Sequence, residues 1–402
     1  MTRGRLLLWT SIAAYCLIGV EIVVMISPFA LYFYSVYGPL LDRLAASPYT
    51  GWTTEFFLPH MVFPDDPLIL AVSYLQLLLV AGLLLFFSAA LPLYYGRFTG
   101  KGVVQVSFYR KIRHPQYLFL AVSGFGLLLY WPRFIILILY VTMLFVYYLL
   151  ARNEEWRMRQ EAPAAYERYM AATPMFLPGE PGGRFYRALF GWLRPKWAGI
   201  ALLYLLSLAA AVGLAMGVRA YAVRTLPLVT VGDMTVVPVF PREAGTVGEL
   251  YRRALADPAV ARQLARRPDI NQAYLMPGDF FLMALVTDAN RRFSDEMIER
   301  FPEIIEWHRH KFRGGLGKFF RIFYNFVSTL GTVHTDYEVE RLVFVAVHDR
   351  AGQRVAPERL FAMGLSRTPA LIVDLDARSR RVLQVIPTSE SHKWGRMPMP
   401  TF

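Results

Sequence analysis

Apolar residues are concentrated in the first half of the chain, in five long runs separated by polar and basic loops. A helix of about 20 apolar residues crosses a bilayer, so runs of this length predict membrane-spanning helices. The two middle runs are shorter, and only Pro132 and Arg133 separate them, which predicts a tight helical hairpin. We expect about five spans, at approximately residues 6–31, 68–91, 115–131, 134–150 and 198–216.

The first apolar run follows a short basic head at residues 1–5, a pattern that also begins secretory signal peptides. The run is longer than the apolar region of a signal peptide, and no small-residue cleavage motif follows it, so we expect a retained helix. Glu21 lies inside this run, and an ionisable group in a span is a candidate functional residue unless it is protonated or pairs with another helix. Cys16 is the single cysteine, which excludes a disulfide framework and a zinc site with several thiolates.

From about residue 226 the pattern becomes mixed, as in a soluble domain, and roughly 175 residues are enough to bury a core. A helix is predicted over 246–266, with Thr246 as a candidate N-cap and Glu249 three positions on. A second helix is expected over 294–311. Strands are predicted over 341–347, 370–375 and 381–386, the last two joined by a hairpin turn at 376–380.

The fold class predicted from these patterns is mainly α. We expect a polytopic transmembrane helical bundle over residues 1–218 and a C-terminal extracytoplasmic α+β domain over 219–402. Composition agrees with a membrane protein, because 55% of residues are hydrophobic and 18% are charged. Soluble domains contain about 25% charged residues on average.

The balance of 43 basic against 30 acidic residues raises the question of nucleic-acid binding. We predict no nucleic-acid partner, because the lysines and arginines gather in loops beside apolar runs, where the positive-inside rule places them. Residues 96–114 carry five basic side chains and no acid, whereas Arg43 stands among four acids in residues 37–67. We therefore expect a multi-pass protein of the inner (plasma) membrane. Its N-terminus and both ends of the hairpin would be cytoplasmic.

Polar and aromatic residues border the hairpin at both ends. They occur before it as Tyr109, Arg113, His114, Pro115 and Tyr117, and after it as Arg152, Glu154 and Glu155, followed by Tyr166, Tyr169 and the sequence Pro174-x-Phe176-x-Pro178.

In order and spacing, these residues resemble the isoprenylcysteine carboxyl methyltransferase and phospholipid methyltransferase superfamily of integral membrane enzymes. The resemblance covers roughly residues 100–180. Two positions depart from it, because Ser107 stands where the family usually has glycine, and Ala162 and Pro163 precede the paired tyrosines where it favours glycine. The resemblance implies S-adenosylmethionine as cofactor, held at the cytoplasmic helix ends beneath a C-terminal cap, and an amphiphilic lipid or prenylated acceptor.

The residue types suit this cofactor. Glu154, or the carboxylate next to it, would accept hydrogen bonds from the ribose hydroxyls, and Arg113 and His114 would bind the methionine carboxylate. Tyr109 and Tyr117 would offer aromatic faces to the sulfonium cation. The alternative is that the basic residues only anchor the hairpin at the lipid headgroups and the carboxylates lie on a solvated face.

Methyl transfer needs alignment and shielding more than acid–base chemistry. We assign catalytic roles to Arg152, which would orient an anionic acceptor, and to Glu155, which, like His114, would take the proton of an amine acceptor. No metal site is expected, because His308 and His310 are two apart on a predicted helix and point away from each other.

Two other functions remain open at this stage. A membrane reductase of the sterol-reductase type shares a related helical architecture and uses a reduced nicotinamide. A non-catalytic membrane anchor or sensor would bind a ligand or partner through its outer domain. Residues 311–331, which mix aromatic and basic side chains, would suit either a membrane interface or a buried helix.

Overall fold

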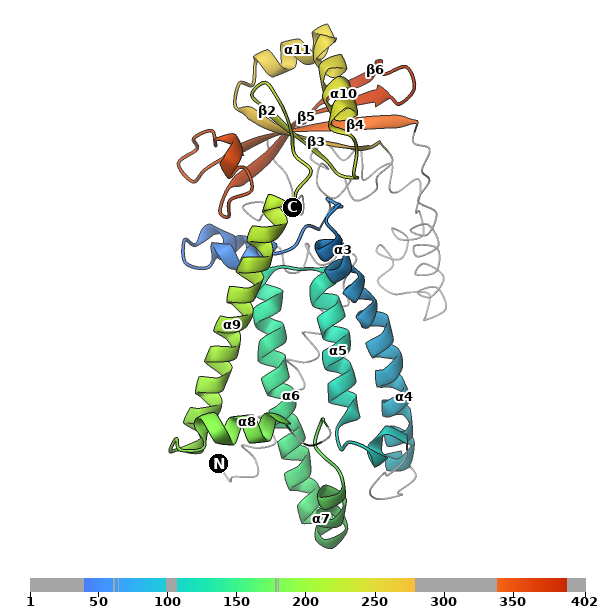
Figure 1. The fold of residues 1–402 in the computed structure, drawn as a ribbon, viewed down its shortest axis with the longest axis vertical. Helices are drawn as coiled ribbons and strands as arrows, with labels where there is room; N and C mark the ends of the chain where they lie inside the picture. The colour runs from blue at the N-terminus through green and yellow to red at the C-terminus, as the bar shows by residue number, and fades with distance from the viewer. Residues whose placement is uncertain are drawn as a thin grey trace. The chain divides into compact units, whose positions relative to one another are not determined.

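The computed structural model of the chain describes residues 40–60, 62–63, 65–98, 107–177, 179, 181–278 and 338–388. The first predicted span with Cys16 and Glu21, the helix over 294–311 and the stretch 311–331 lie outside the described residues. The chain divides into two compact units, one built on apolar helices and one built on a sheet (Figure 1). Phe56–Leu58 and Pro67–Ala222 belong to the helical unit, and the sheet unit contains the chain from Val223 onward together with residues 40–55 and 59–66.

The helical unit contains four apolar helical segments. They are α3 (Pro67–Tyr74), continued through the 3-10 turn η2 (Leu75–Leu77) into α4 (Leu78–Phe98), then α5 (Pro115–Tyr130), α6 (Phe134–Glu161) and α9 (Lys196–Arg224). Within the described residues, three helices are long and apolar enough to cross a membrane, at Pro67–Leu93, Phe134–Glu161 and Lys196–Arg224. Helix α5 has only 16 residues, as its short apolar run predicts. The mainly helical, membrane-type architecture is therefore confirmed in this coarse form.

Helices α4 and α5 approach each other closely because glycine lies at their contact. A Cβ atom added to Gly82 would meet the backbone of Ser123, and one added to Gly126 would meet the backbone of Leu79. The Ser123 hydroxyl also donates a hydrogen bond to the Leu79 carbonyl at 3.1 Å. Small residues at such a contact are typical of membrane helices, so Gly82 and Gly126 serve helix packing here.

The turn between α5 and α6 is fixed by a fully buried arginine. The guanidinium of Arg133 lies 4.0 Å from the centre of the Phe56 ring, and the backbone N–H of Phe57 donates to the carbonyl of Pro132 at 2.8 Å. Arg219, near the end of α9, donates to the carbonyl of Phe56. The part of α9 around Arg219 therefore lies at the α5–α6 turn, at the end of the helical unit opposite the start of α5 (Figure 1). In the predicted five-span arrangement the last span would also end on the side opposite the start of α5. The number of spans and their orientation in the membrane stay predictions.

The sheet unit contains six strands within the described residues, in the spatial order β1 to β6. All neighbours are antiparallel except β2 and β3, which are parallel and connected by two helices. The elements are β1 (Val229–Val231), β2 (Met234–Pro238), α10 (Ala244–Ala256), α11 (Pro258–Ala265), β3 (Ile270–Pro277), β4 (Val339–His348), β5 (Ser366–Asp376) and β6 (Val382–Pro387). Apolar side chains of the two helices and of one sheet face form the core, among them Val236, Val247, Leu250, Phe344 and Val373.

Residues of the first loop pack within the sheet unit. The Glu55 carboxylate accepts a hydrogen bond from the backbone N–H of Gly364 at 2.6 Å. The backbone N–H of Phe63 donates to Val239, and the Phe63 ring stacks on Phe240 with their centres 4.7 Å apart. The sheet unit therefore combines two parts of the sequence that the predicted boundary at residue 218 separates.

The three predicted strands correspond to β4, β5 and β6, and the predicted hairpin turn joins β5 to β6. The single helix predicted over 246–266 is wrong. Helix α10 begins at Ala244, so Thr246 lies inside it and Glu243 is the N-cap. The helix also breaks at Asp257, whose carboxylate accepts from the backbone N–H groups of Ala259 and Val260 and so begins α11. A proline after such a cap fits the first helical turn and interrupts a continuing helix.

Candidate functional site

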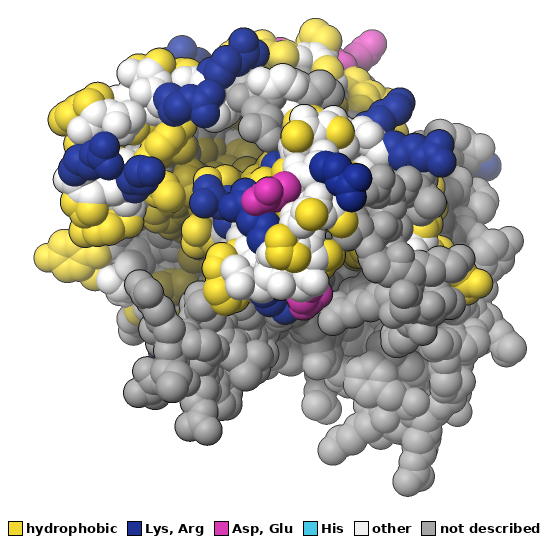
Figure 2. Space-filling view, turned by 90° about the horizontal axis from the view of Figure 1, so that it is seen from below, with side chains coloured by type: hydrophobic (Ala, Val, Ile, Leu, Met, Phe, Trp, Pro, Cys, Tyr) yellow, Lys and Arg dark blue, Asp and Glu magenta, His cyan; other side chains and the backbone are white. Residues whose placement is uncertain are grey.

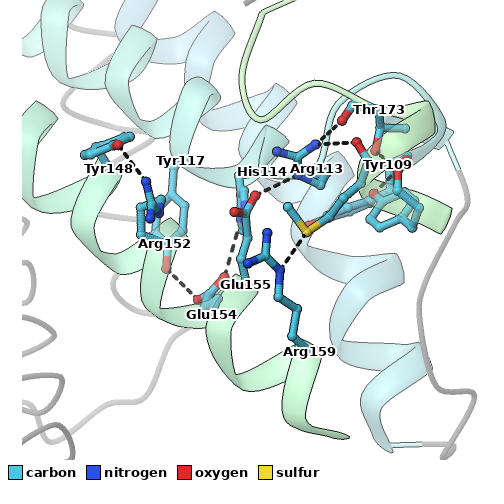
Figure 3. Close-up of polar contacts among 12 residues, drawn as sticks. Tyr109, Arg113, His114, Tyr117, Tyr148, Arg152, Glu154, Glu155, Arg159 and Thr173 are labelled. Carbon is cyan, nitrogen blue, oxygen red and sulfur yellow. Dashed lines mark hydrogen bonds and ion pairs between the residues drawn. The ribbon is translucent and has the colours of Figure 1, made fainter. Parts of the chain in front are cut away.

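The candidate site lies where the two ends of the hairpin meet a third segment (Figure 3). Pro115 begins α5, and Arg113 and His114 lie directly before it. Their backbone N–H groups donate to the carbonyls of Pro174 and Met175 at 2.9 and 3.1 Å. The segment after α7 (Pro163–Ala172) therefore runs against the entrance of α5, and the continuation of α6 beyond the apolar part carries the two carboxylates to the same place.

Arg113 connects these segments through its side chain. Its Nε atom donates to Oε1 of Glu155 at 2.7 Å, and Nη1 donates to the carbonyl of Met170 at 3.2 Å and to the carbonyl of Thr173. Both members of the ion pair are buried. The last carbonyls of a helix have no partner within the helix, and the guanidinium supplies one for α7. Arg113 therefore fixes the end of α7 onto α6.

The imidazole of His114 lies between the two carboxylates. Nδ1 is 3.5 Å from Oε2 of Glu154, and Nε2 is 3.5 Å from Oε1 of Glu155. These separations suit ion pairs but exceed good hydrogen bonds. Neither ring nitrogen makes a hydrogen bond within the described part of the chain, although the residue is only 3% exposed. A buried imidazole with two unsatisfied nitrogens has bonding capacity left for a ligand or water.

The protonation of His114 follows from the same neighbours. Burial lowers its pKa, but the interactions with Glu154 and Glu155 outweigh burial, so the pKa of His114 is raised above its usual value. The charged imidazolium, with two N–H donors, is favoured beside two carboxylates.

Glu154 is the more accessible carboxylate, because 24% of its side chain is exposed whereas Glu155 is buried. The Tyr117 hydroxyl donates to Oε1 of Glu154 at 2.6 Å. The Tyr117 ring stacks on Tyr147 with their centres 5.6 Å apart, and His114 lies beside Phe176 at 6.0 Å. The carboxylate therefore has a fixed partner and lies next to aromatic rings.

The remaining motif tyrosines hold the third segment in place. Tyr169 donates to the carbonyl of Tyr109 at 2.7 Å, and the Tyr109 hydroxyl donates to the side chain of Gln116 at 3.0 Å. Burial raises the pKa of Tyr169 to about 12, so its hydroxyl stays a donor at neutral pH. Figure 3 shows Tyr109 beside Thr173, away from Glu154, so the structure does not bring this predicted cofactor residue to the two carboxylates.

Arg152 also lies apart from the cluster. It is exposed, donates to the hydroxyl of Tyr148 at 3.1 Å and lies 5.9 Å from that ring. Of the seven predicted site residues, five meet at one place in the structure. These are Arg113, His114, Tyr117, Glu154 and Glu155.

Tyr147 and Thr173 also contact this cluster, and they were not predicted from the sequence as site residues. Tyr147 lies seven residues before Glu154 on α6, and this spacing of two helical turns could have identified it as a neighbour on the same face. Thr173 contributes its backbone carbonyl to Arg113, and a carbonyl has no signature in the sequence.

Ala162, at a position where the superfamily that the sequence resembles favours glycine, causes no backbone strain. Ala162 connects α6 to α7 with φ of −145° and ψ of 68°, a φ that does not require glycine. Ser107 begins the 3-10 turn η3 (Ser107–Arg110) that leads into the site. Alanine at the α6–α7 connection is therefore compatible with the loop geometry.

Within the described residues, no group of three or more His, Cys, Asp or Glu side chains is arranged to hold a metal ion. His308 and His310 lie outside those residues. Comparisons of the chain with family models, with curated proteins and with solved structures found no match.

Proposed function

We propose that the protein is an integral membrane methyltransferase that uses S-adenosylmethionine and acts on an amphiphilic acceptor. One observation carries the proposal. A buried imidazole with two unsatisfied nitrogens lies between two carboxylates at the end of an apolar hairpin. Polar groups at the ends of membrane helices are reached most easily by molecules that partition into the interface, such as a lipid or a prenylated compound.

The donors and acceptors of the cluster fit the cofactor. Glu154 would accept hydrogen bonds from the ribose hydroxyls, and the N–H groups of His114 would donate to the methionine carboxylate. Tyr117 and Tyr147 would place aromatic faces near the cationic sulfur. When bound, S-adenosylmethionine supplies a methyl group on a good leaving group. Arg113 would not contact the cofactor but would position the site, since its contacts with Glu155, Met170 and Thr173 fix the end of α7 onto α6.

The residues of the chain would then align the acceptor and exclude water. If the acceptor is an amine, Glu154 is better placed than Glu155 to take its proton, because Glu155 is buried and bonded to Arg113. Arg152, which is exposed and bonded to Tyr148, would orient an anionic group of the acceptor. The proposal keeps the N-terminus and the site on the cytoplasmic side of the plasma membrane and the sheet unit on the other side, following the loop charges.

A non-catalytic membrane anchor is the second candidate, and one observation favours it. The Arg113 side chain bonds Glu155, Met170 and Thr173 of its own unit, which is what a purely structural contact would show. The membrane reductase remains an alternative by architecture alone. Transfer of a radiolabelled methyl group by purified membranes, measured beside oxidation of a reduced nicotinamide, separates the two enzymes.

Calorimetric titration of the purified full chain with S-adenosylmethionine tests the proposal directly. We expect Glu154→Gln to weaken binding by at least about tenfold, because a hydrogen bond to a charged group is lost. Tyr117→Phe should weaken it less, by about fivefold, because the carboxylate remains but loses its fixed partner. Arg152→Gln is the control and should leave the affinity unchanged, because its side chain contacts Tyr148 instead of the cluster. No binding by the wild type, or equal binding by Glu154→Gln, would refute the site.

A further inference from the structure

Helix α8 (Pro181–Phe190) directly precedes α9 in the sequence and lies beside the first turn of α9 in Figure 1. One face of α8 packs on the start of α9. Phe190 is buried, the Tyr186 hydroxyl donates to the carbonyl of Lys196 at 3.2 Å, and a Cβ atom added to Gly199 would meet the Tyr186 side chain. Helix α8 is therefore held against its neighbour by only part of its surface.

A second face of α8 is apolar and uncovered. Phe185 and Leu189 are four residues apart and so share a side of the helix, with 58% and 47% of their surface exposed. Trp192, in the turn that follows, is 75% exposed, and its indole N–H donates to the carbonyl of Leu189 at 2.9 Å. Trp197, at the start of α9, is 69% exposed. We call these four exposed apolar side chains the aromatic stripe.

The cations of this segment lie beside the aromatic stripe. Arg184 and Arg187 are three residues apart and occupy a face of α8 different from that of Phe185 and Leu189. Arg194 follows in the turn and Lys196 begins α9, and all four cations are exposed. None of them forms an ion pair with a carboxylate of the described chain, and residues 181–224 contain no Asp or Glu. The segment is therefore both apolar and uniformly positive.

The position of α8 in the helical unit fits this surface. The end of α9 lies at the α5–α6 turn through Arg219 and Phe56, so its start, with α8, lies toward the end that holds His114 and Glu155. Figure 2, which views the molecule from below, shows arginine and lysine side chains around apolar surface at this end. Tryptophan and basic residues at the end of a membrane helix are typical of the lipid–water interface.

We propose that residues 184–197 form a binding surface for the anionic lipid headgroups of the leaflet at this end of the helical unit. The aromatic stripe would enter the upper hydrocarbon layer, and Arg184, Arg187, Arg194 and Lys196 would contact the phosphates. A solvated segment would explain the cations but not the four large apolar side chains of the aromatic stripe exposed beside them. This inference does not depend on methyl transfer, because none of these residues belongs to the candidate site.

A fluorescent label on the aromatic stripe tests the proposal in the full chain. Cys16 is the only cysteine, so Leu189→Cys in a Cys16→Ser background carries one environment-sensitive label. The protein is reconstituted into vesicles of phosphatidylcholine with increasing shares of phosphatidylglycerol. We expect the emission to shift toward that of an apolar environment as the anionic share rises. Each cation near an anionic surface contributes about fivefold to binding, so Arg184→Gln/Arg187→Gln should weaken the docked state about 25-fold.

The matched control is Arg252→Gln/Arg253→Gln, which removes two exposed cations from α10 in the sheet unit and should leave the emission unchanged. A water-like emission at every lipid composition would overturn the proposal, because the stripe would then be a solvated face. An apolar emission that is equal in neutral and anionic vesicles would also overturn it, because the cations would then have no role. High salt should reproduce the effect of the double glutamine variant, since it screens exposed charges.

Discussion

The two units each contain a buried arginine–carboxylate pair, and the two pairs are built differently. In the sheet unit, Arg341 on β4 bonds both oxygens of Asp374 on β5 at 2.6 and 2.8 Å, and the side chain of Gln384 on β6 donates to the same carboxylate. In the helical unit, Arg113 gives one bond to Glu155 and directs others to backbone carbonyls.

The neighbours of the pairs differ as well. The Asp374 carboxylate accepts hydrogen bonds from Arg341 and Gln384, which lie opposite it on the two neighbouring strands. Both of its oxygens therefore have partners within the sheet. Glu155 adjoins His114, whose ring nitrogens make no hydrogen bond within the described residues, and His114 adjoins the partly exposed Glu154. A buried ion pair alone is weak evidence for a function. The ring nitrogens of His114, which make no hydrogen bond within the described residues, distinguish the helical pair as part of a candidate site. The ion pair by itself does not.

The largest effect is expected from breaking the sheet pair. Asp374→Ala should lower the free energy of unfolding by about 3–5 kcal/mol, because it leaves a buried guanidinium without its carboxylate. The double variant Arg341→Met/Asp374→Leu should recover most of this loss, since neither charge is then buried. Denaturant titration of the purified full chain, followed by circular dichroism, measures both.

The partly exposed ion pair Arg267–Asp269 provides the control within the same unit. Its side chains are 33% and 31% exposed, so Asp269→Ala should change the free energy of unfolding by less than about 1 kcal/mol. Equal losses for Asp374→Ala and Asp269→Ala would contradict the structural role given to the buried pair.

The helical pair should behave like the sheet pair in stability but not in binding. Glu155→Ala should cost about 3 kcal/mol, and Arg113→Met/Glu155→Leu should recover much of that stability. Binding of S-adenosylmethionine should be lost in both variants, because His114 then lacks the carboxylate at Nε2 and the end of α7 lacks its tie to α6.

Thermal unfolding and calorimetric titration of the same preparations separate the two outcomes. If the double variant recovers both stability and binding, Arg113 and Glu155 are a structural contact like Arg341 and Asp374. If Arg341→Met/Asp374→Leu also abolishes S-adenosylmethionine binding, the sheet pair affects binding as well, and the proposed difference between the two pairs is wrong.

The helical unit was predictable because its signals are long and local. Apolar runs predict helices, and a two-residue connection predicts that the ends of the hairpin meet, which places Arg113 near Glu155. The bonds from Arg113 to the carbonyls of Met170 and Thr173 were not predictable, because backbone acceptors carry no residue identity. The separation of Tyr109 and Arg152 from the cluster depends on side-chain direction, which the spacing along the chain does not determine.

The sheet unit was less predictable from the sequence. The missed strand β3 and the missed break between α10 and α11 have specific causes. Strand β3 is buried on both faces and includes Asn271 and Gln272, so its apolar run is confined to residues 273–276 and it has no alternating pattern. The Asn271 side chain is satisfied by the carbonyls of Val347 and Val355, which are distant in sequence. The break at Asp257-Pro258 was readable, because a capping residue followed by proline is a signal for a new helix.

The smallest effect is the dependence of stability on pH that His114 should confer. Its pKa in the folded protein is raised above the usual value of 6.5, so its contribution is fully present below pH 6.5 and is lost as the pH rises through the folded pKa. We therefore expect the difference in melting temperature between wild type and His114→Gln to be largest below pH 6.5 and to shrink as the pH rises through the folded pKa. A difference that grows with rising pH would mean that burial dominates and that His114 is neutral, which would remove the imidazolium from the proposed site.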